Sequence, residues 1–214
     1  VRSFNAAFAK HYNMNPTQLR RTGGASGALA KHNGIQVRLA YRPPYDIDAL
    51  LRYLGERQMT GVDVITPEQN TFAKTMTLQQ GEQLFTGWVF ARFNEVNFRV
   101  DLQVSEGLSQ VLPEVITRVR DLLDLDADPQ AINPALHGAF PEGDGLRVPG
   151  TLDGFELAVR AVLGQQITVA AARTLANRLV TRFGEPIETP LTGLNRLFPT
   201  AKVLASASGD ELGS

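Results

Sequence analysis

Cysteine is absent from the 214-residue sequence. Its absence excludes disulfide bonds, a thiolate nucleophile and any zinc site with cysteine ligands. The sequence also has no run of about 18 or more apolar residues, and no charged segment leads into an apolar one at its start. It therefore predicts neither a membrane span nor a signal peptide, and we expect a cytoplasmic protein with no membrane partner.

An excess of charge of one sign is also absent, because the formal net charge is −1 at pH 7. Such a balance neither indicates nor excludes a nucleic-acid partner, since local patches decide that kind of binding. Hydrophobic residues make up 43% of the chain, which is enough for a core and ordinary for a globular protein. The first residue is valine rather than methionine, which is typical of a fragment or a processed product.

Neither a metal site nor a cofactor is predicted. The histidines lie in separate segments, without metal-ligand or triad spacing: His11, His32 and His137. The acidic run from Asp121 to Asp128 invites a calcium site, but an EF-hand loop beginning at Asp124 needs glycine and glutamate where Pro129 and Ala135 stand. We interpret the run as a solvated helix end and turn.

Residues 1–21 predict a helix on one face of which aromatic residues recur every four positions. Pro16 and two nearby asparagines end this helix, and residues 17–21 are expected to begin a short second one. The small, glycine-rich segment 22–34 is typical of a linker, and we assign everything after it to a different unit.

Residues 35–126 predict an α+β domain with an antiparallel sheet and flanking helices. We predict strands at 36–41, 71–79, 83–93 and 96–104, hairpin turns at 80–81 and 94–95, and helices at 49–57 and 108–123. The last strand is the clearest, because its apolar and polar residues alternate strictly. Asp46 or Asp48 is expected to cap the first helix.

Residues 127–214 predict an all-helical domain that is incomplete. The expected helices are 128–138, Asp153 to about Gly164, 168–183, 194–198 and 201–207, with a glycine- and proline-rich loop at 138–150. Gly184 is a reasonable stop for the 168–183 helix. An exposed apolar stripe on that helix predicts that the fragment self-associates.

Two pairs of residues have both a structural and a functional interpretation. Asp153 and Glu156 stand three apart like a capping box, and two carboxylates can also perform acid–base chemistry. Trp88 and Phe90 lie on a predicted strand, where aromatic residues form a core or stack on nucleic-acid bases. The structural interpretation is the simpler one for both pairs.

Two adjacent glutamines, Gln165 and Gln166, lie at the joint between two predicted helices that otherwise look buried. They form either a polar connection that caps free backbone groups or a protruding tip presented to a partner. Tyr53 and Arg57 stand four apart on the 49–57 helix, and their spacing alone indicates only an ordinary helical pair.

Three segments, in this order, resemble 3-methyladenine DNA glycosylase II, the AlkA family. YRPPYDIDALLRYLGERQMTGVD is similar to the opening of its N-terminal domain, LRVPGTLDGFELAVRAVLGQQITVAAARTL to the start of its helix-hairpin-helix domain, and FPTAKVLASAS to the segment that follows. The resemblance covers about residues 36–214. It implies a TBP-like α+β domain followed by the first part of a helical glycosylase domain.

The resemblance also implies a function, in which an alkylated base is extruded from double-stranded DNA and its glycosidic bond is hydrolysed. Gln166 corresponds to the residue that wedges into the gap left by the base, and Gln165 to a residue beside the base pocket. With Ile167 they form the expected DNA-binding turn. Tyr53 corresponds to an aromatic residue that lines the pocket, where a cationic alkylated purine stacks.

The segment FNAAFAKHYNMNPTQLR resembles the C-terminal end of an AraC-type helix-turn-helix domain, with matches at Phe4, Phe8, Pro16 and Arg20. An AraC-type domain joined to a glycosylase implies an Ada-like fusion of a transcriptional regulator with a repair enzyme. Most of the regulator is then expected upstream of the first residue.

The family's catalytic aspartate follows a glycine-rich hairpin of the type LPGIGxxTA, and this sequence contains neither. The resemblance therefore implies that the catalytic residue lies downstream of Ser214 and that this chain alone is inactive. The alternative hypothesis is a non-catalytic DNA-binding or regulatory module that keeps a glycosylase scaffold.

Overall fold

A computed structural model describes residues 19–21 and 34–209. Its sheet has the strand order β1-β2-β6-β5-β4-β3, and every neighbouring pair is antiparallel. The strands are β1 (Leu19–Arg21), β2 (Ile35–Ala40), β3 (Asp63–Thr66), β4 (Thr71–Gln80), β5 (Gln83–Asn94) and β6 (Arg99–Val104). The helices are α2 (Ile47–Glu56), α3 (Leu112–Leu122), α4 (Pro129–Leu136), α5 (Gly154–Leu163), α6 (Val169–Phe183) and α7 (Ala201–Ser206). The predicted α+β class is confirmed.

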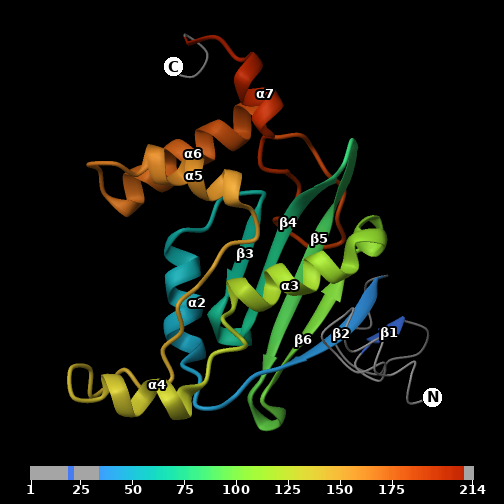
Figure 1. The fold of residues 1–214 in the computed structure, drawn as a ribbon. Helices are drawn as coiled ribbons and strands as arrows, with labels where there is room; N and C mark the ends of the chain where they lie inside the picture. Colours follow the sequence, from blue (N-terminus) through green and yellow to red (C-terminus); the bar gives the residue numbers. More distant parts are fainter. Residues whose placement is uncertain (1–18, 22–33, 210–214) are drawn as a thin grey trace.

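Four of the helices form two pairs around the sheet (Figure 1). Helices α2 and α3 cover one face of the sheet, whereas α5 and α6 lie side by side beyond its β3 end. Short 3-10 turns at Pro67–Gln69, Glu95–Asn97 and Glu106–Val111 connect the elements. Within the described part of the chain, no helix is both long and apolar enough to cross a bilayer.

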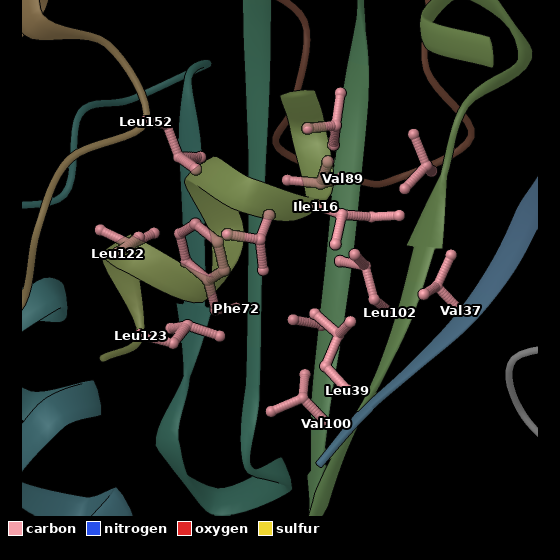
Figure 2. Close-up of a cluster of buried hydrophobic side chains, with 14 of the residues drawn as sticks. Val37, Leu39, Phe72, Val89, Val100, Leu102, Ile116, Leu122, Leu123 and Leu152 are labelled. Carbon is pink, nitrogen blue, oxygen red and sulfur yellow. The ribbon is translucent and has the colours of Figure 1, made fainter. Parts of the chain in front are cut away.

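The main core lies between the sheet and the two helices that cover it. Alternate residues of the strands, such as Leu39, Val89 and Leu102, point to the same side and are almost fully buried. They pack against Leu51 of α2 and Ile116 of α3, and Figure 2 shows Leu39, Val89, Leu102 and Ile116 converging. Asp46 caps α2 by accepting a hydrogen bond from the backbone of Ala49, so the capping prediction is confirmed for Asp46.

The strand predicted at 96–104 begins three residues late, because a 3-10 turn occupies Glu95–Asn97. The Asn94 side chain accepts a hydrogen bond from the Asn97 backbone (3.1 Å), and Phe98 has a φ of 46°. Val96 is consequently 89% exposed, although its spacing matches the buried residues of β6. The alternation of apolar and polar residues could not reveal the turn, because Val96 keeps the same two-residue spacing as the buried residues of β6.

The helix predicted at 194–198 is wrong. Leu194 bridges Gly61 and Arg196 bridges Pro186, so this segment is extended. The Thr75 hydroxyl donates a hydrogen bond to the Arg196 carbonyl (2.6 Å) across the face of the sheet opposite α2 and α3. Tertiary pairing with the sheet therefore overrides a local pattern that looked helical. The short strand β3 was also not predicted.

The expected second helix at 17–21 is wrong for the residues that the structure describes, because Leu19–Arg21 form β1. Leu19 lies opposite Val37 and Arg21 opposite Ile35, which makes β1 an edge strand of the sheet. The segment 1–21, which we assigned to a separate unit, therefore includes a strand that belongs to the sheet of the α+β domain. The helix predicted in the first part of 1–21 and most of the 22–34 linker lie outside the described residues.

The corrected start of β6 predicts opposite outcomes for two valines. Val96→Ala should change the free energy of unfolding by no more than about 0.5 kcal/mol, because the side chain is exposed. Val100→Ala should lower it by about 2 kcal/mol, because Val100 is fully buried. Urea unfolding followed by tryptophan fluorescence measures both, and equal losses would contradict the turn.

Candidate nucleic-acid interface

The glutamine pair forms a tight, solvent-exposed turn between α5 and α6. Gly164 ends α5, and the Thr168 side chain caps α6 by accepting a hydrogen bond from Ala171 (3.2 Å). Gln165 and Gln166 between them are both exposed, and Gln166 adopts a left-handed conformation with a φ of 60°. A residue other than glycine in this region costs about 1–3 kcal/mol, so the backbone at the tip of the turn is mildly strained.

A cleft of about 300 Å³ opens beside this turn, between α2, α5, α6 and the β3–β4 end of the sheet. Tyr53 of α2 and Ile167 of the turn both line it, and each is 42% exposed. Gln165 and Gln166 stand at its edge, since Gly164 and Ile167 on either side line the cleft. The structure thus brings all four predicted site residues to one region, although only two of them form the cleft wall.

Tyr53 and Arg57 are more than neighbours on a helix. The Arg57 guanidinium lies 3.9 Å from the centroid of the Tyr53 ring and donates a hydrogen bond to the Tyr53 carbonyl (3.1 Å). This is a cation–π contact on the face of an aromatic ring that borders the cleft. The spacing of four residues was visible in the sequence, but the ring's exposure to the cleft was not.

Four charged side chains line the cleft together, and we call Asp63, Lys74, Glu156 and Arg160 the ionic cluster. The Lys74 ammonium donates to Asp63 Oδ1 (2.5 Å) and to Glu156 Oε1 (3.0 Å), and Arg160 donates to the same Oε1 (3.1 Å). The cluster joins strands β3 and β4 to helix α5. Sequence reasoning missed it, because Lys74 and Glu156 are 82 residues apart.

Burial and pairing act in opposite directions on Lys74. Desolvation alone would lower its pKa, but the carboxylates of Asp63 and Glu156 outweigh that effect and raise the pKa above its usual value. Lys74 is therefore charged at neutral pH and cannot serve as an amine nucleophile. The cluster holds two positive and two negative side chains, so its formal charges balance.

The capping-box prediction is correct for Asp153 and wrong for Glu156. Asp153 Oδ1 accepts hydrogen bonds from the backbones of Phe155 (2.8 Å) and Glu156 (3.4 Å). The Glu156 side chain does not return the bond, because it is buried in the ionic cluster and the Asp153 N–H donates to Thr151 instead. The two carboxylates are thus committed to different partners and do not form an acid–base pair.

The acidic run has structural partners. The Asp128 side chain caps α4 by accepting a hydrogen bond from Gln130, Asp124 accepts one from Val148, and Asp126 pairs with Arg120. Hydrogen bonding from Arg120 lowers the pKa of Asp126. No group of three or more potential metal-ligating side chains occurs among residues 19–21 and 34–209.

The two aromatic residues on β5 differ in their exposure. Trp88 is buried, as the core interpretation predicts, whereas Phe90 is only partly covered. Neither residue lines the cleft. The sheet therefore presents no aromatic pair to the region where the four predicted site residues meet.

Several solved structures that superpose on this chain are DNA glycosylases. The 3-methyladenine DNA glycosylase of Archaeoglobus fulgidus superposes with a TM-score of 0.61 at 19% identity, over 82% of this chain and 60% of that one. The 8-oxoguanine glycosylase/lyase of Clostridium acetobutylicum, in complex with double-stranded DNA, gives 0.54 at 14% identity, over 86% and 57%. These likenesses establish the fold.

Residues 36–153 match the family described as the AlkA N-terminal domain, and the chain belongs to this family. DNA-3-methyladenine glycosylase 2 of Escherichia coli is 32% identical over 174 residues, which are 81% of this chain and 59% of that protein. The probable bifunctional transcriptional activator/DNA repair enzyme AlkA of Mycobacterium tuberculosis is 31% identical over 96% of this chain and 41% of its own length. The chain thus spans about half the length of these relatives.

The ionic cluster yields a test of stability. Lys74→Met leaves Asp63 and Glu156 buried without their shared cation, so it should lower the free energy of unfolding by about 3–5 kcal/mol near neutral pH. The matched change Lys202→Met, on an exposed side chain, should have little effect. Urea unfolding of both variants measures the difference.

The loss should also depend on pH, and its sign follows from the raised pKa of Lys74. The stability that a cation with a raised pKa contributes is fully present below its unfolded value of about 10.4 and is lost as pH rises through the higher folded value. The deficit of Lys74→Met relative to the wild type should therefore stay constant from neutral pH to about 10 and shrink above it. A deficit that persists unchanged in strongly alkaline solution would contradict the cluster.

Proposed function

We propose that this chain is the base-capturing part of a DNA glycosylase that extrudes alkylated bases, of the 3-methyladenine type, from double-stranded DNA. The observation that carries the proposal is the position of the exposed Gln165–Gln166 turn directly beside the cleft that Tyr53 lines. A base pushed out of the duplex at the turn would have a receiving site within the same protein. Extrusion costs a few kcal/mol, which a wedge and a stacking surface together can supply.

Gln166 is the proposed wedge. Its side chain is exposed at the tip of the turn, and an amide offers both a donor and an acceptor to the base left without a partner. Gln165 and Ile167 are proposed to contact the DNA on either side of it. Gln165 is also proposed to border the extruded base, although it does not line the cleft of the free chain.

Tyr53 is the proposed stacking surface for the extruded base. An alkylated purine of this type carries positive charge, and aromatic faces attract cations by about 0.5–2 kcal/mol. The Arg57 guanidinium, 3.9 Å from the ring centroid, supports this role, because it occupies the ring face as such a cation would. Both residues line the cleft.

The catalytic carboxylate is proposed to lie outside these 214 residues, so that this chain binds but does not hydrolyse. Stabilising a developing sugar cation requires an uncompensated negative charge near it. The carboxylates that line the cleft are Asp63 and Glu156, and both already pair with Lys74 or Arg160. No cofactor is proposed, since the positive charge of the alkylated base already makes it a good leaving group.

A fusion to a transcriptional regulator is proposed for the longer protein. The match to the M. tuberculosis protein covers 96% of this chain and must therefore reach into residues 1–33, whereas the match to the E. coli glycosylase covers 81%. The name of the M. tuberculosis protein combines a transcriptional activator with a DNA repair enzyme. This supports the AraC-type interpretation of the N-terminal segment, and we propose a cytoplasmic location for the longer protein.

Release of 3-methyladenine from alkylated duplex DNA tests the function. We expect release by a chain extended downstream to the length of its relatives and none by the 214 residues alone, measured by chromatography of the freed base. Sedimentation of the shorter chain shows whether it self-associates through exposed residues such as Val162 and Leu175. Inactivity of both chains would favour the non-catalytic regulatory module.

The wedge is tested by a pair of substitutions at one position. Gln166→Gly suits the left-handed backbone and Gln166→Ala does not, so the glycine variant should be the more stable by up to about 1 kcal/mol. Both remove the amide and should reduce base extrusion by about tenfold, seen as a smaller rise in 2-aminopurine fluorescence in a lesion-bearing duplex. Gln83→Ala, an exposed glutamine on β5, is the matched control. Undiminished extrusion in both variants would exclude Gln166 as the wedge.

A further inference from the structure

Glu156 has two carboxylate oxygens, and the ionic cluster uses only one of them. The hydrogen bonds that it accepts from Lys74 and from Arg160 both fall on Oε1. Within the described part of the chain no hydrogen bond falls on Oε2, and Oε2 is not among the solvent-inaccessible side-chain atoms that lack a partner. Since Glu156 lines the cleft and is only 6% exposed, the open space that Oε2 meets is the cleft.

The position of Glu156 relative to Tyr53 is fixed by a second contact. Arg160 donates one hydrogen bond to Glu156 Oε1 (3.1 Å) and another to the backbone carbonyl of Arg57 (2.5 Å), at the end of α2. Arg57 in turn donates to the Tyr53 carbonyl (3.1 Å). These hydrogen bonds therefore fix the position of the Tyr53 ring relative to the Glu156 carboxylate across the cleft.

We infer that Glu156 Oε2 is the group that selects the extruded base by its edge, a role that rests on the proposed function. A planar base stacked on Tyr53 lies parallel to the ring and directs its edge along the cleft, and a cleft of about 300 Å³ accommodates a purine. A carboxylate oxygen only accepts hydrogen bonds. Glu156 therefore favours a purine that presents an exocyclic amine, as adenine derivatives do, and disfavours one that presents a carbonyl oxygen.

The buried charges make this selection stronger than it would be in water. Hydrogen bonds to ionised groups are about twice as strong as neutral ones, and a buried carboxylate oxygen facing a carbonyl has no compensation. Lys74 and Arg160 offset the charge of Glu156 through Oε1, so the carboxylate is held in place without using its second oxygen. Discrimination by about tenfold or more is expected.

Glu156→Gln gives a directional test. The amide oxygen must face the donors Lys74 and Arg160, which places the amide NH2 group where Oε2 was. The variant therefore replaces the acceptor in the cleft with a donor. Its preference for an amine-bearing base should disappear or reverse, which simple loss of packing would not produce.

The measurement is fluorescence anisotropy of the 214-residue chain with four duplexes. One carries 3-deaza-3-methyladenine, one carries the same base without its amine, one carries a tetrahydrofuran abasic site, and one is undamaged. Wild type should bind the amine-bearing duplex about tenfold or more tightly than the amine-free one. Glu156→Gln should bring that ratio to one or below, whereas Glu114→Gln, an exposed carboxylate paired with Arg118 on α3, should keep the wild-type ratio.

The outcomes separate this inference from the proposed function. Equal wild-type affinity for the amine-bearing and amine-free duplexes, with both bound more tightly than undamaged DNA, overturns the role of Glu156 alone. No preference for any lesion over undamaged DNA overturns the proposed function and this inference with it. If Glu156→Gln fails to fold, Lys74→Met/Glu156→Gln removes one charge of each sign, and the same ratio is measured on it.

Discussion

The shared cation of Lys74 is the interaction on which the rest of the site depends. It lies between a carboxylate on β3 and a carboxylate on α5, and so connects the sheet to the helices that carry the glutamine turn. Buried ion pairs are poor sources of net stability but costly to leave incomplete. The cluster therefore specifies how the two parts of the chain meet, whereas most of the stabilisation comes from the apolar core of the sheet.

The geometry of the proposed base site depends on this ion-paired junction between the sheet and α5. Arg160 extends the cluster to the end of α2, which carries Tyr53, and α5 continues from Arg160 to the strained turn at Gln166. Three elements distant in sequence are thereby held around one cleft. A site that must receive a base from outside needs such rigidity, because a displacement of about 1 Å is enough to impair a binding or catalytic geometry.

The sequence predicted the local features well and the long-range ones poorly. Alternation identified the β4–β5 hairpin, and side-chain chemistry identified Asp153 as a cap and narrowed the cap of α2 to Asp46 or Asp48. Both signals act over a few residues, so they are visible in one dimension. The partner of Glu156 lies 82 residues away, and the extended conformation of 194–198 depends on a hydrogen bond from Thr75. Neither local alternation nor capping chemistry reports contacts between residues so far apart in the sequence. Resemblance to a family supplied the proposed roles of Tyr53 and Gln166, which spacing alone could not.

The extended segment 194–198 also affects how the chain unfolds. By sequence it follows α6, yet it lies on the face of the sheet opposite α2 and α3, and its Phe198 shares a small core with Val180 of α6 and Met59 after α2. Detaching the helical part would expose this face and divide that core. Opening the helical part therefore costs the burial of that core, so we expect the sheet and helices α5 and α6 to unfold as one cooperative unit rather than as two independent foldons.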